Sequence, residues 1–276
     1  MPIFMDRHNL KGMTAGDLAE AHRKDLQVQR KYGVKFLTYW FDEARGTTFC
    51  LVDAPDKDTA QCVHREAHGF VAADIVEVSL SAIEAFLGRI NDPEPPSGSS
   101  SPSMDPGHRA IMFTDIVGSM EMTARLGDRM STELVRAHDS VVRRSLKKSD
   151  GQEVKRTGDG IMASFVASTA AVDCAISIQR EFKKYNKGNP EPIHIRIGLD
   201  CGNPVEDSND LFGATVQLAA RLCTSASPDE IIVSENIARE CGHSDVFRRL
   251  TPRQLKGMAL PTMSFQCAWD LSIPYE

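Results

Sequence analysis

Short apolar runs alternate with longer amphipathic segments along the first 80 residues of the chain. The apolar runs are typical of strands, and the amphipathic segments have the spacing of helices with one buried face. The expected strands are 3–5, 34–40, 47–52 and 75–78, and the expected helices are 14–28 and 58–68. The first helix opens on Thr14, a favoured N-cap residue. The order βαββαβ predicts a ferredoxin-like domain.

The rest of the chain continues this alternation over a longer stretch. Strands are expected at 110–114, 193–198 and 230–233, and helices at 119–148, 170–184 and 214–222. Residues 154–165 form two further strands that turn at Asp159-Gly160, because Asp-Gly between apolar runs favours a hairpin. The pattern predicts an α/β sandwich with helices over a mixed sheet, so the fold class of the whole chain is α+β.

Proline, serine and glycine dominate residues 92–107, where no apolar periodicity survives. Such a composition is typical of an extended linker. The sequence therefore predicts an N-terminal domain at 1–91, a linker at 92–107 and a second domain at 108–276.

Composition excludes several functional classes. The 276 residues carry a formal net charge of -6, whereas nucleic-acid binders usually have a basic domain, so no nucleic-acid partner is expected. No apolar run approaches the ~20 residues of a membrane span, and the start of the chain lacks a signal-peptide pattern. We therefore expect a cytoplasmic protein without a membrane partner.

The seven cysteines are odd in number and include no CxxC pair, which argues against a disulfide framework. Cys62 has two histidines, His64 and His68, close to it in the sequence, and is the cysteine that we expect to raise a metal question.

Two aspartates stand at positions suited to a metal. Asp115 lies where an apolar strand ends, and Asp159 lies between Gly158 and Gly160, which leave room for a bulky ligand. Paired carboxylates suit Mg²⁺, which completes its coordination shell with phosphate oxygens and water. Taken alone, Asp115 could equally cap the helix that follows it.

Three more polar residues have suggestive spacings. Lys155 precedes Asp159 by four residues, so both side chains project from the same face of an extended segment. Gln217 and Arg221 are four residues apart and share one helix face. Lys155 and Arg221 are also residue types found on any solvated surface.

Four ordered motifs resemble the catalytic domain of class III nucleotidyl cyclases, and the resemblance covers nearly all of residues 108–272. The motifs are FTDIVGS at 113–119, KRTGDG at 155–160, RIGLDCG at 196–202 and DLFGATVQLAARL at 210–222. Enzymes of this family convert a nucleoside triphosphate to the 3′,5′-cyclic monophosphate and pyrophosphate.

The resemblance implies two Mg²⁺ or Mn²⁺ ions per active site, held by Asp115, Asp159 and the backbone carbonyl of Ile116. It also implies that Lys155 and Asp210 select the purine. An ammonium can donate to the adenine N1 and a carboxylate can accept from the 6-amino group, so ATP is the expected substrate.

In the same family, Arg221 corresponds to the arginine that stabilises charge on the α-phosphate, and Gln217 stands where an asparagine usually orients the ribose. The glutamine keeps the amide but is longer by one methylene, which loosens this geometry. The family draws the metal aspartates from one chain and the purine pair, amide and arginine from another. A homodimer with two equivalent sites is therefore implied.

Four histidines, His8, His22, His64 and His68, fall within the first 68 residues. His64 and His68 lie one turn apart on the expected helix, where they could share a metal ion or simply be solvated or hydrogen-bonded. Residues 2–80 resemble a small bacterial ferredoxin-like family of unknown function that is associated with nickel binding. This implies that the four histidines bind Ni²⁺ or another transition metal; a dimerisation module is the alternative.

The sequence thus favours an adenylate cyclase with an N-terminal domain that senses a metal or small ligand. The alternative is a catalytically degenerate cyclase domain that binds nucleotide or serves as a dimerisation module, and Gln217 is its one sequence support. A third interpretation, a different nucleotide base, is disfavoured by Lys155 and Asp210.

Overall fold

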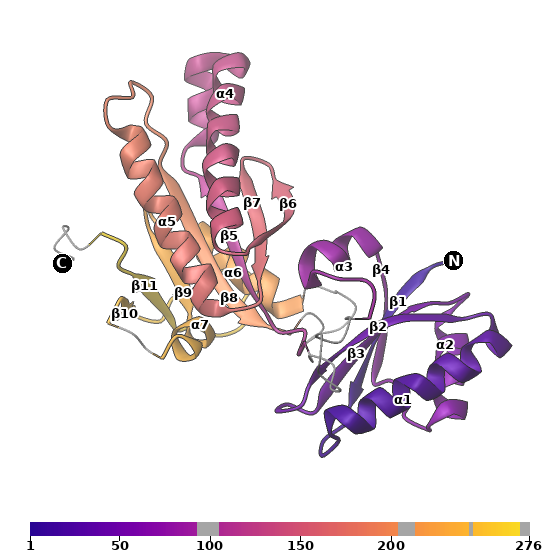
Figure 1. Cartoon of the computed structure of the whole chain (residues 1–276). Coiled ribbons are helices and arrows are strands. Elements are labelled where there is room, and N and C mark those ends of the chain that lie inside the picture. Colours follow the sequence, from indigo (N-terminus) through magenta and orange to yellow (C-terminus); the bar gives the residue numbers. More distant parts are fainter. Residues whose placement is uncertain (93–104, 204–212, 243–244, 271–276) are drawn as a thin grey trace. The chain divides into compact units, whose positions relative to one another are not determined.

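The computed structural model describes residues 1–92, 105–203, 213–242 and 245–270 (Figure 1). The chain divides into two compact units. The N-terminal unit is built mainly from residues 1–108, and the C-terminal unit from residues 109–202 together with the chain from 214 onward.

The described part of the N-terminal unit contains a four-stranded antiparallel sheet in the order β2-β3-β1-β4. Its strands are β1 (Ile3–Asn9), β2 (Lys35–Asp42), β3 (Thr47–Asp53) and β4 (Asp74–Val78). Its helices are α1 (Ala15–Val28), α2 (Lys57–Ala67) and α3 (Leu80–Leu87), with the short 3-10 helix η1 (Gln29–Tyr32) after α1. This is the predicted ferredoxin-like arrangement, with α3 added after the last strand.

The start of α1 follows from its sequence, because Thr14 and Asp17 form a reciprocal capping box. Side chains two residues apart on a strand share a face. Phe4 on β1 packs in the apolar core of this unit, and Asp6 and His8 follow it at the same spacing and are also buried. Two polar side chains are therefore placed at the edge of an apolar core, where each needs a partner.

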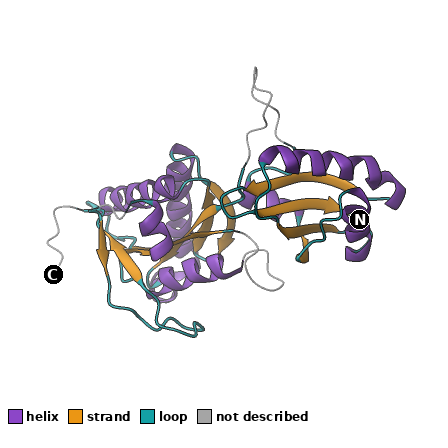
Figure 2. Cartoon of the chain, turned by 90° about the horizontal axis from the view of Figure 1, so that it is seen from below, coloured by secondary structure: helices purple, strands orange, loops and turns teal. Residues whose placement is uncertain are grey.

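In the C-terminal unit, the described strands form a seven-stranded sheet in the order β10-β11-β9-β8-β5-β7-β6, in which β8 and β9 pair in parallel. Helices flank these strands (Figure 2). The strands are β5 (Arg109–Ile116), β6 (Gln152–Thr157), β7 (Gly160–Phe165), β8 (Ile195–Gly202), β9 (Ile231–Ser234), β10 (Phe247–Arg249) and β11 (Ser264–Cys267). The helices are α4 (Ser119–Lys148), α5 (Ser168–Asn186), α6 (Gly213–Ser225) and α7 (Glu235–Glu240). The four strands β6, β7, β5 and β8 repeat the ferredoxin-like order.

The sequence pattern does not predict β10 (FRR) or β11 (SFQC), because neither has the run of mostly apolar residues that marks the other short strands. Their pairing is non-local: β11 lies between β9 and β10 and pairs antiparallel with both.

The two faces of β8 meet different helices. Ile197 and Leu199 belong to the main apolar core, which also contains buried residues of α4 and α5. These two helices lie side by side in Figure 1. On the other face, Gly198 and Gly202 lie directly under α6, because a side chain at either position would collide with atoms of that helix. The glycines of the strand therefore set how closely α6 docks.

Replacing Gly198 with alanine is expected to lower the stability of the C-terminal unit by about 1 to 3 kcal/mol, because the added methyl group overpacks the β8–α6 contact. Thermal and urea unfolding of the full chain would measure this. Gly16→Ala is the control, since its methyl group meets only an ordinary contact with Thr14. Equal stability of the two variants would contradict the expectation.

Candidate functional site

The backbones of β5 and β7 approach each other closely beside the predicted metal aspartates, Asp115 and Asp159. A side chain at Gly160 would collide with the carbonyl oxygen of Thr114, so glycine is required there. Asp115 follows Thr114 at the end of β5, and Asp159 precedes Gly160 in the turn between β6 and β7. The approach therefore brings the two carboxylates close enough together for Asp159 to raise the pKa of Asp115.

The surroundings of Asp115 act in opposite directions on the pKa of its carboxyl group. Burial raises the pKa of Asp115 above its ordinary value and the Asp159 carboxylate raises it further, whereas Arg196 opposes both effects. Arg196 is directly opposite Asp115 on β8, and its Nε and Nη2 lie 2.7 and 2.6 Å from Oδ2 of Asp115. Two adjacent, half-buried carboxylates with oxygen donors fit a hard divalent cation.

Arg196 was part of a sequence motif, but its role beside Asp115 was not predicted. The β5–β8 register creates this neighbour, and the register of strands 81 residues apart is not visible in a local pattern.

The other expected residues of the metal and purine sites are placed as follows. Ile116 is the last residue of β5, with a buried side chain. Lys155 is exposed on β6 next to a β-bulge and pairs with Met162 of β7. Asp210, its predicted partner in purine selection, lies outside the described residues.

Gln217 and Arg221 lie one turn apart on α6, and both side chains are exposed. Neither makes a hydrogen bond or an ion pair with another residue of the described part of the chain. The structure therefore brings Asp115 and Asp159 together with Arg196, and leaves the α6 pair facing solvent.

An open groove of about 710 Å³ runs beside Asp159. Gly158 and Arg156 line it from the β6–β7 side, and Met120 and Met122 line it from the start of α4. Met120 is 80% exposed. The groove is large enough for a ligand much bigger than a metal ion, and its wall combines a carboxylate, a guanidinium and apolar side chains.

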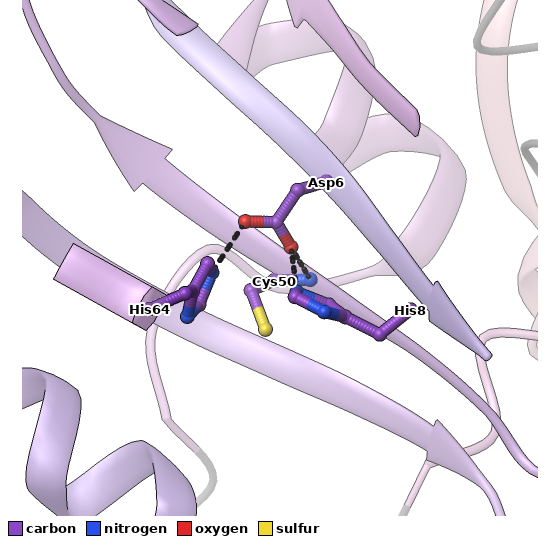
Figure 3. Close-up of side chains that lie close together, drawn as sticks. All are labelled: Asp6, His8, Cys50 and His64. Atoms are coloured by element: carbon purple, nitrogen blue, oxygen red, sulfur yellow. Dashed lines mark hydrogen bonds and ion pairs between the residues drawn. The ribbon is translucent and has the colours of Figure 1, made fainter. Parts of the chain in front are cut away.

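The N-terminal unit contains a second polar cluster, centred on the fully buried Asp6 (Figure 3). Its carboxylate accepts hydrogen bonds from His8 Nε2 at 3.2 Å, from His64 Nε2 at 2.7 Å and from the backbone N–H of Cys50 at 3.1 Å. Ligand atoms of these four residues lie within 4.8 Å of one another. Strands β1 and β3 and helix α2 thus converge on one carboxylate.

His64 joins this cluster to a second one. Its Nδ1 donates to Asp25 Oδ1 at 3.1 Å, and Asp25 also accepts from His68 Nε2 at 3.2 Å. Burial alone would lower the pKa of His64, but the carboxylates of Asp6 and Asp25 outweigh it and raise this pKa to about 10. Without a metal, His64 is therefore a buried imidazolium between two carboxylates.

His22 completes the set of four histidines. Its Nε2 donates to Asp92 at 3.1 Å. His8, His22, His64 and His68 all line one small cavity of about 10 Å³. Nδ1 of His8 and Nδ1 of His22 are buried without a hydrogen-bond partner among the described residues. Since the other nitrogen of each ring donates to a carboxylate, these two atoms carry lone pairs, which is the arrangement found in metal-binding histidines.

The sequence interpretation missed part of this cluster. Cys50 and not Cys62 is the cysteine beside the histidines, because β3 pairs with β1 and brings Cys50 opposite Asp6. The i, i+2 spacing of Asp6 and His8 on one strand face is a signal that could have indicated Asp6. Asp25 follows His22 by three residues on α1 and could have been found in the same way.

Residues 104–263, more than half of the chain, match the family described as "Adenylate and Guanylate cyclase catalytic domain", and the chain belongs to this family. Residues 4–78 match the family described as "Nickel responsive protein SCO4226-like". The chain thus carries a domain of the nickel-responsive type followed by a cyclase catalytic domain, as its sequence motifs indicated.

Curated relatives support the C-terminal assignment. The chain is 32% identical over 130 residues to a putative adenylate cyclase 3 of Rhizobium meliloti. This match covers 46% of this chain and 22% of that protein. It is 29% identical over 131 residues to an adenylate cyclase of Streptomyces coelicolor, covering 48% of this chain and 33% of that protein. The chain therefore spans at most a third of the length of these relatives.

Solved structures share the fold. The guanylate cyclase domain of RhGC from Catenaria anguillulae, solved with GTP, matches with a TM-score of 0.52 and 20% identity over 58% of this chain and 96% of that one. The adenylyl cyclase CyaB from P. aeruginosa matches with a TM-score of 0.51 and 22% identity over 58% and 93%. Within the described residues, no helix is both long and apolar enough to cross a bilayer.

In the presence of a chelator, we expect the N-terminal unit to lose stability as the pH rises from about 6.5 to about 10. The pKa of His64 is raised from 6.5 to about 10, so the folded state holds this proton more tightly than the unfolded state. The resulting stabilisation is complete below pH 6.5 and is lost as the pH passes through about 10.

Thermal unfolding of the full chain at several pH values tests this, with His64→Gln as the comparison. The variant should show a flatter pH dependence over this interval. An identical pH dependence of the two proteins would contradict the assignment of a charged His64.

Proposed function

We propose that the chain is an adenylate cyclase that converts ATP to 3′,5′-cyclic AMP and pyrophosphate at sites shared by two copies of its C-terminal unit. The observation that carries the proposal is the pairing of Asp115 and Asp159 beside Arg196, at the point where the cyclase family match would place a metal site. Mg²⁺ or Mn²⁺ is the cation whose chemistry suits these donors.

Asp115, Asp159 and the backbone carbonyl of Ile116 would hold two such cations. When bound, these lower the pKa of the ribose 3′-hydroxyl and neutralise charge on the departing pyrophosphate. In the reaction, the 3′-oxygen forms a bond to the α-phosphorus, the bond between that phosphorus and the oxygen bridging to the β-phosphate breaks, and the hydroxyl proton passes to solvent.

Other residues of the chain bind and orient the nucleotide. The Arg221 guanidinium stabilises the negative charge that develops on the α-phosphate. The Gln217 amide orients the ribose, and Lys155 with Asp210 selects adenine. Arg196 neutralises Asp115 in the absence of a cation.

Two features support assembly with a second copy of the chain. Gln217 and Arg221 are exposed on α6 and lack described partners, as expected for groups that complete a site on another chain. Met120 and Met130 are large apolar side chains exposed on α4, and Met120 lines the groove beside Asp159. Assembly with a second copy over this groove would cover the Met120 side chain.

Product analysis tests the reaction directly. The purified full chain is incubated with Mn²⁺ and each of ATP, GTP, CTP and UTP, and products are separated by chromatography. We expect cyclic AMP from ATP alone, and its loss in Asp159→Ala because one metal carboxylate is removed. Cyclic GMP as the main product would reject the adenine assignment and leave cyclisation intact.

Mixing two inactive variants tests the shared site. Asp115→Asn and Arg221→Ala should each reduce the rate by at least ~100-fold, as loss of one charge-stabilising group commonly does. An equal mixture should recover about a quarter of the wild-type rate, because half of the dimers are mixed and each mixed dimer has one intact site. No recovery would place both halves of the site within one chain.

A catalytically degenerate domain that only binds nucleotide or dimerises is the alternative, and the longer amide of Gln217 is what favours it. It predicts no cyclic product from any nucleotide. Restoration of a product by Gln217→Asn would then assign the loss to this side chain.

We further propose that the N-terminal unit binds Ni²⁺ or another transition metal and adjusts how the catalytic halves meet. The residues fit such a metal, because unpartnered Nδ1 atoms of His8 and His22 line the same cavity as His64 and His68. Imidazole ligands suit Ni²⁺, Zn²⁺ and Cu²⁺. Asp6 and Asp92 would hold the outer nitrogens of His8 and His22.

Titration of Ni²⁺ into the full chain should show binding by calorimetry and a change in the cyclase rate or in the affinity of the dimer. His22→Ala should weaken Ni²⁺ binding by at least ~10-fold, since it removes a ligand. Cys62→Ala, on the same helix as His64, should leave it unchanged. Confirmed binding with no effect on rate or dimer affinity would reject the sensing role.

A further inference from the structure

Two adjacent residues of α4, His138 and Asp139, reach toward the metal aspartates from the opposite side of the sheet. His138 is fully buried, and the Asp139 side chain is 7% exposed. Neither belongs to a motif that the sequence analysis singled out. A buried ionisable pair is costly unless its hydrogen bonds are satisfied, so its partners indicate what it does.

The first connection leads to Asp115. His138 Nε2 lies 3.2 Å from Oγ1 of Thr114, the residue immediately before Asp115. The same Oγ1 accepts the backbone N–H of Ile161 at 3.1 Å, and Ile161 follows Gly160 at the start of β7. One hydroxyl, held by one imidazole, therefore joins β5 to β7 at the point of their close approach.

The second connection leads to Asp159. Asp139 Oδ2 lies 3.2 Å from Nε of Arg156, and Arg156 Nη2 donates to the carbonyl oxygen of Gly158 at 3.4 Å. Gly158 has a positive φ of 75° and precedes Asp159 in the turn. The carboxylate on α4 thus holds a guanidinium that in turn holds the backbone of the turn carrying Asp159.

The two connections meet in a consistent hydrogen-bond pattern. Burial alone would raise the pKa of Asp139, but the hydrogen bond with His138 and the charge of Arg156 lower it, so the carboxylate is ionised and can only accept. His138 Nδ1, 3.2 Å from Asp139 Oδ1, therefore carries a proton. Nε2 of the same ring lies at the Thr114 hydroxyl, so each of these groups has a partner.

We propose that His138 and Asp139 are positioning residues that hold Asp115 and Asp159 at the separation a divalent cation requires. This inference rests on the proposed cation site at these aspartates. Neither residue touches the metal or the nucleotide; His138 acts through Thr114, and Asp139 acts through Arg156. Their loss should weaken metal binding without removing a ligand, an effect that commonly amounts to 10- to 100-fold for residues behind a metal site.

The test measures Mn²⁺ binding to the full chain through the electron paramagnetic resonance signal of the free Mn²⁺. Binding that remains in Asp115→Asn is subtracted, so that the difference reports the site at Asp115. Asp139→Asn should weaken the remaining binding by roughly 10-fold, and Asp139→Glu, which keeps the charge, should recover part of it. Arg156→Gln, at a half-exposed position, should weaken it similarly and covers the case in which Asp139→Asn fails to fold.

Glu153→Gln is the matched control. It breaks the pair between Glu153 and Arg143, which also joins β6 to α4, with distances of 2.6 and 2.9 Å. Because this pair is more exposed than Asp139, the variant should lower stability less than Asp139→Asn does, and it should keep wild-type Mn²⁺ affinity. Equal Mn²⁺ affinity in wild type and both the Asp139→Asn and Arg156→Gln variants, or equal weakening by Glu153→Gln, would overturn the proposal.

Mn²⁺ binding and cyclic-nucleotide formation distinguish failure of the positioning role from failure of the proposed cyclase activity. If wild type binds Mn²⁺ in an Asp115-dependent way but forms no cyclic nucleotide, the proposed function fails while the positioning role is still decided by the variants. If wild type shows no Asp115-dependent binding, the positioning role is overturned with the cation site itself.

Discussion

The C-terminal unit depends on the close approach of β5 and β7 at Gly160 and Thr114. Only a residue without a side chain permits this contact, and it places Asp115 and Asp159 next to each other although like charges repel. On one face of the sheet, Arg196 offsets this repulsion through its contact with Asp115. On the other face, hydrogen bonds from α4 hold the two strands in place. A cation at the carboxylates would relieve the remaining repulsion, so the strain in this arrangement and its proposed chemistry have the same origin.

The N-terminal unit has the same strand order as β6, β7, β5 and β8 of the C-terminal unit, but its buried carboxylates have different partners. Asp6 and Asp25 are compensated by imidazoles of their own chain, and His64 holds a proton between them. A metal ion in this cavity would have to displace that proton, because Nδ1 of His64 cannot bind a metal while it donates to Asp25. Metal binding would therefore exchange one set of interactions for another, and this exchange is the physical basis of the proposed response to a metal.

Local patterns predicted much of the fold. The helix expected at 119–148 is α4 with the same bounds, although the non-helical backbone of Gly127 interrupts it. The Asp-Gly signal correctly marked the β6–β7 turn. The cyclase motifs were recognisable because each keeps its residues within a short segment. By contrast, Cys50 was overlooked in favour of Cys62, since proximity along the chain is a poor guide when two strands pair.

The sequence by itself determined the order of the elements, the two families and the candidate residues carried by their motifs. Periodicity, turn propensities and motif spacing depend on neighbours within a few residues, so they can be read from the chain directly. The tertiary structure decided which side chains meet: Asp6 with His64, Arg196 with Asp115, and Asp139 with Arg156. Each of these contacts depends on strand register or on a helix packing against a sheet, and such geometry exists only once distant segments have been brought together.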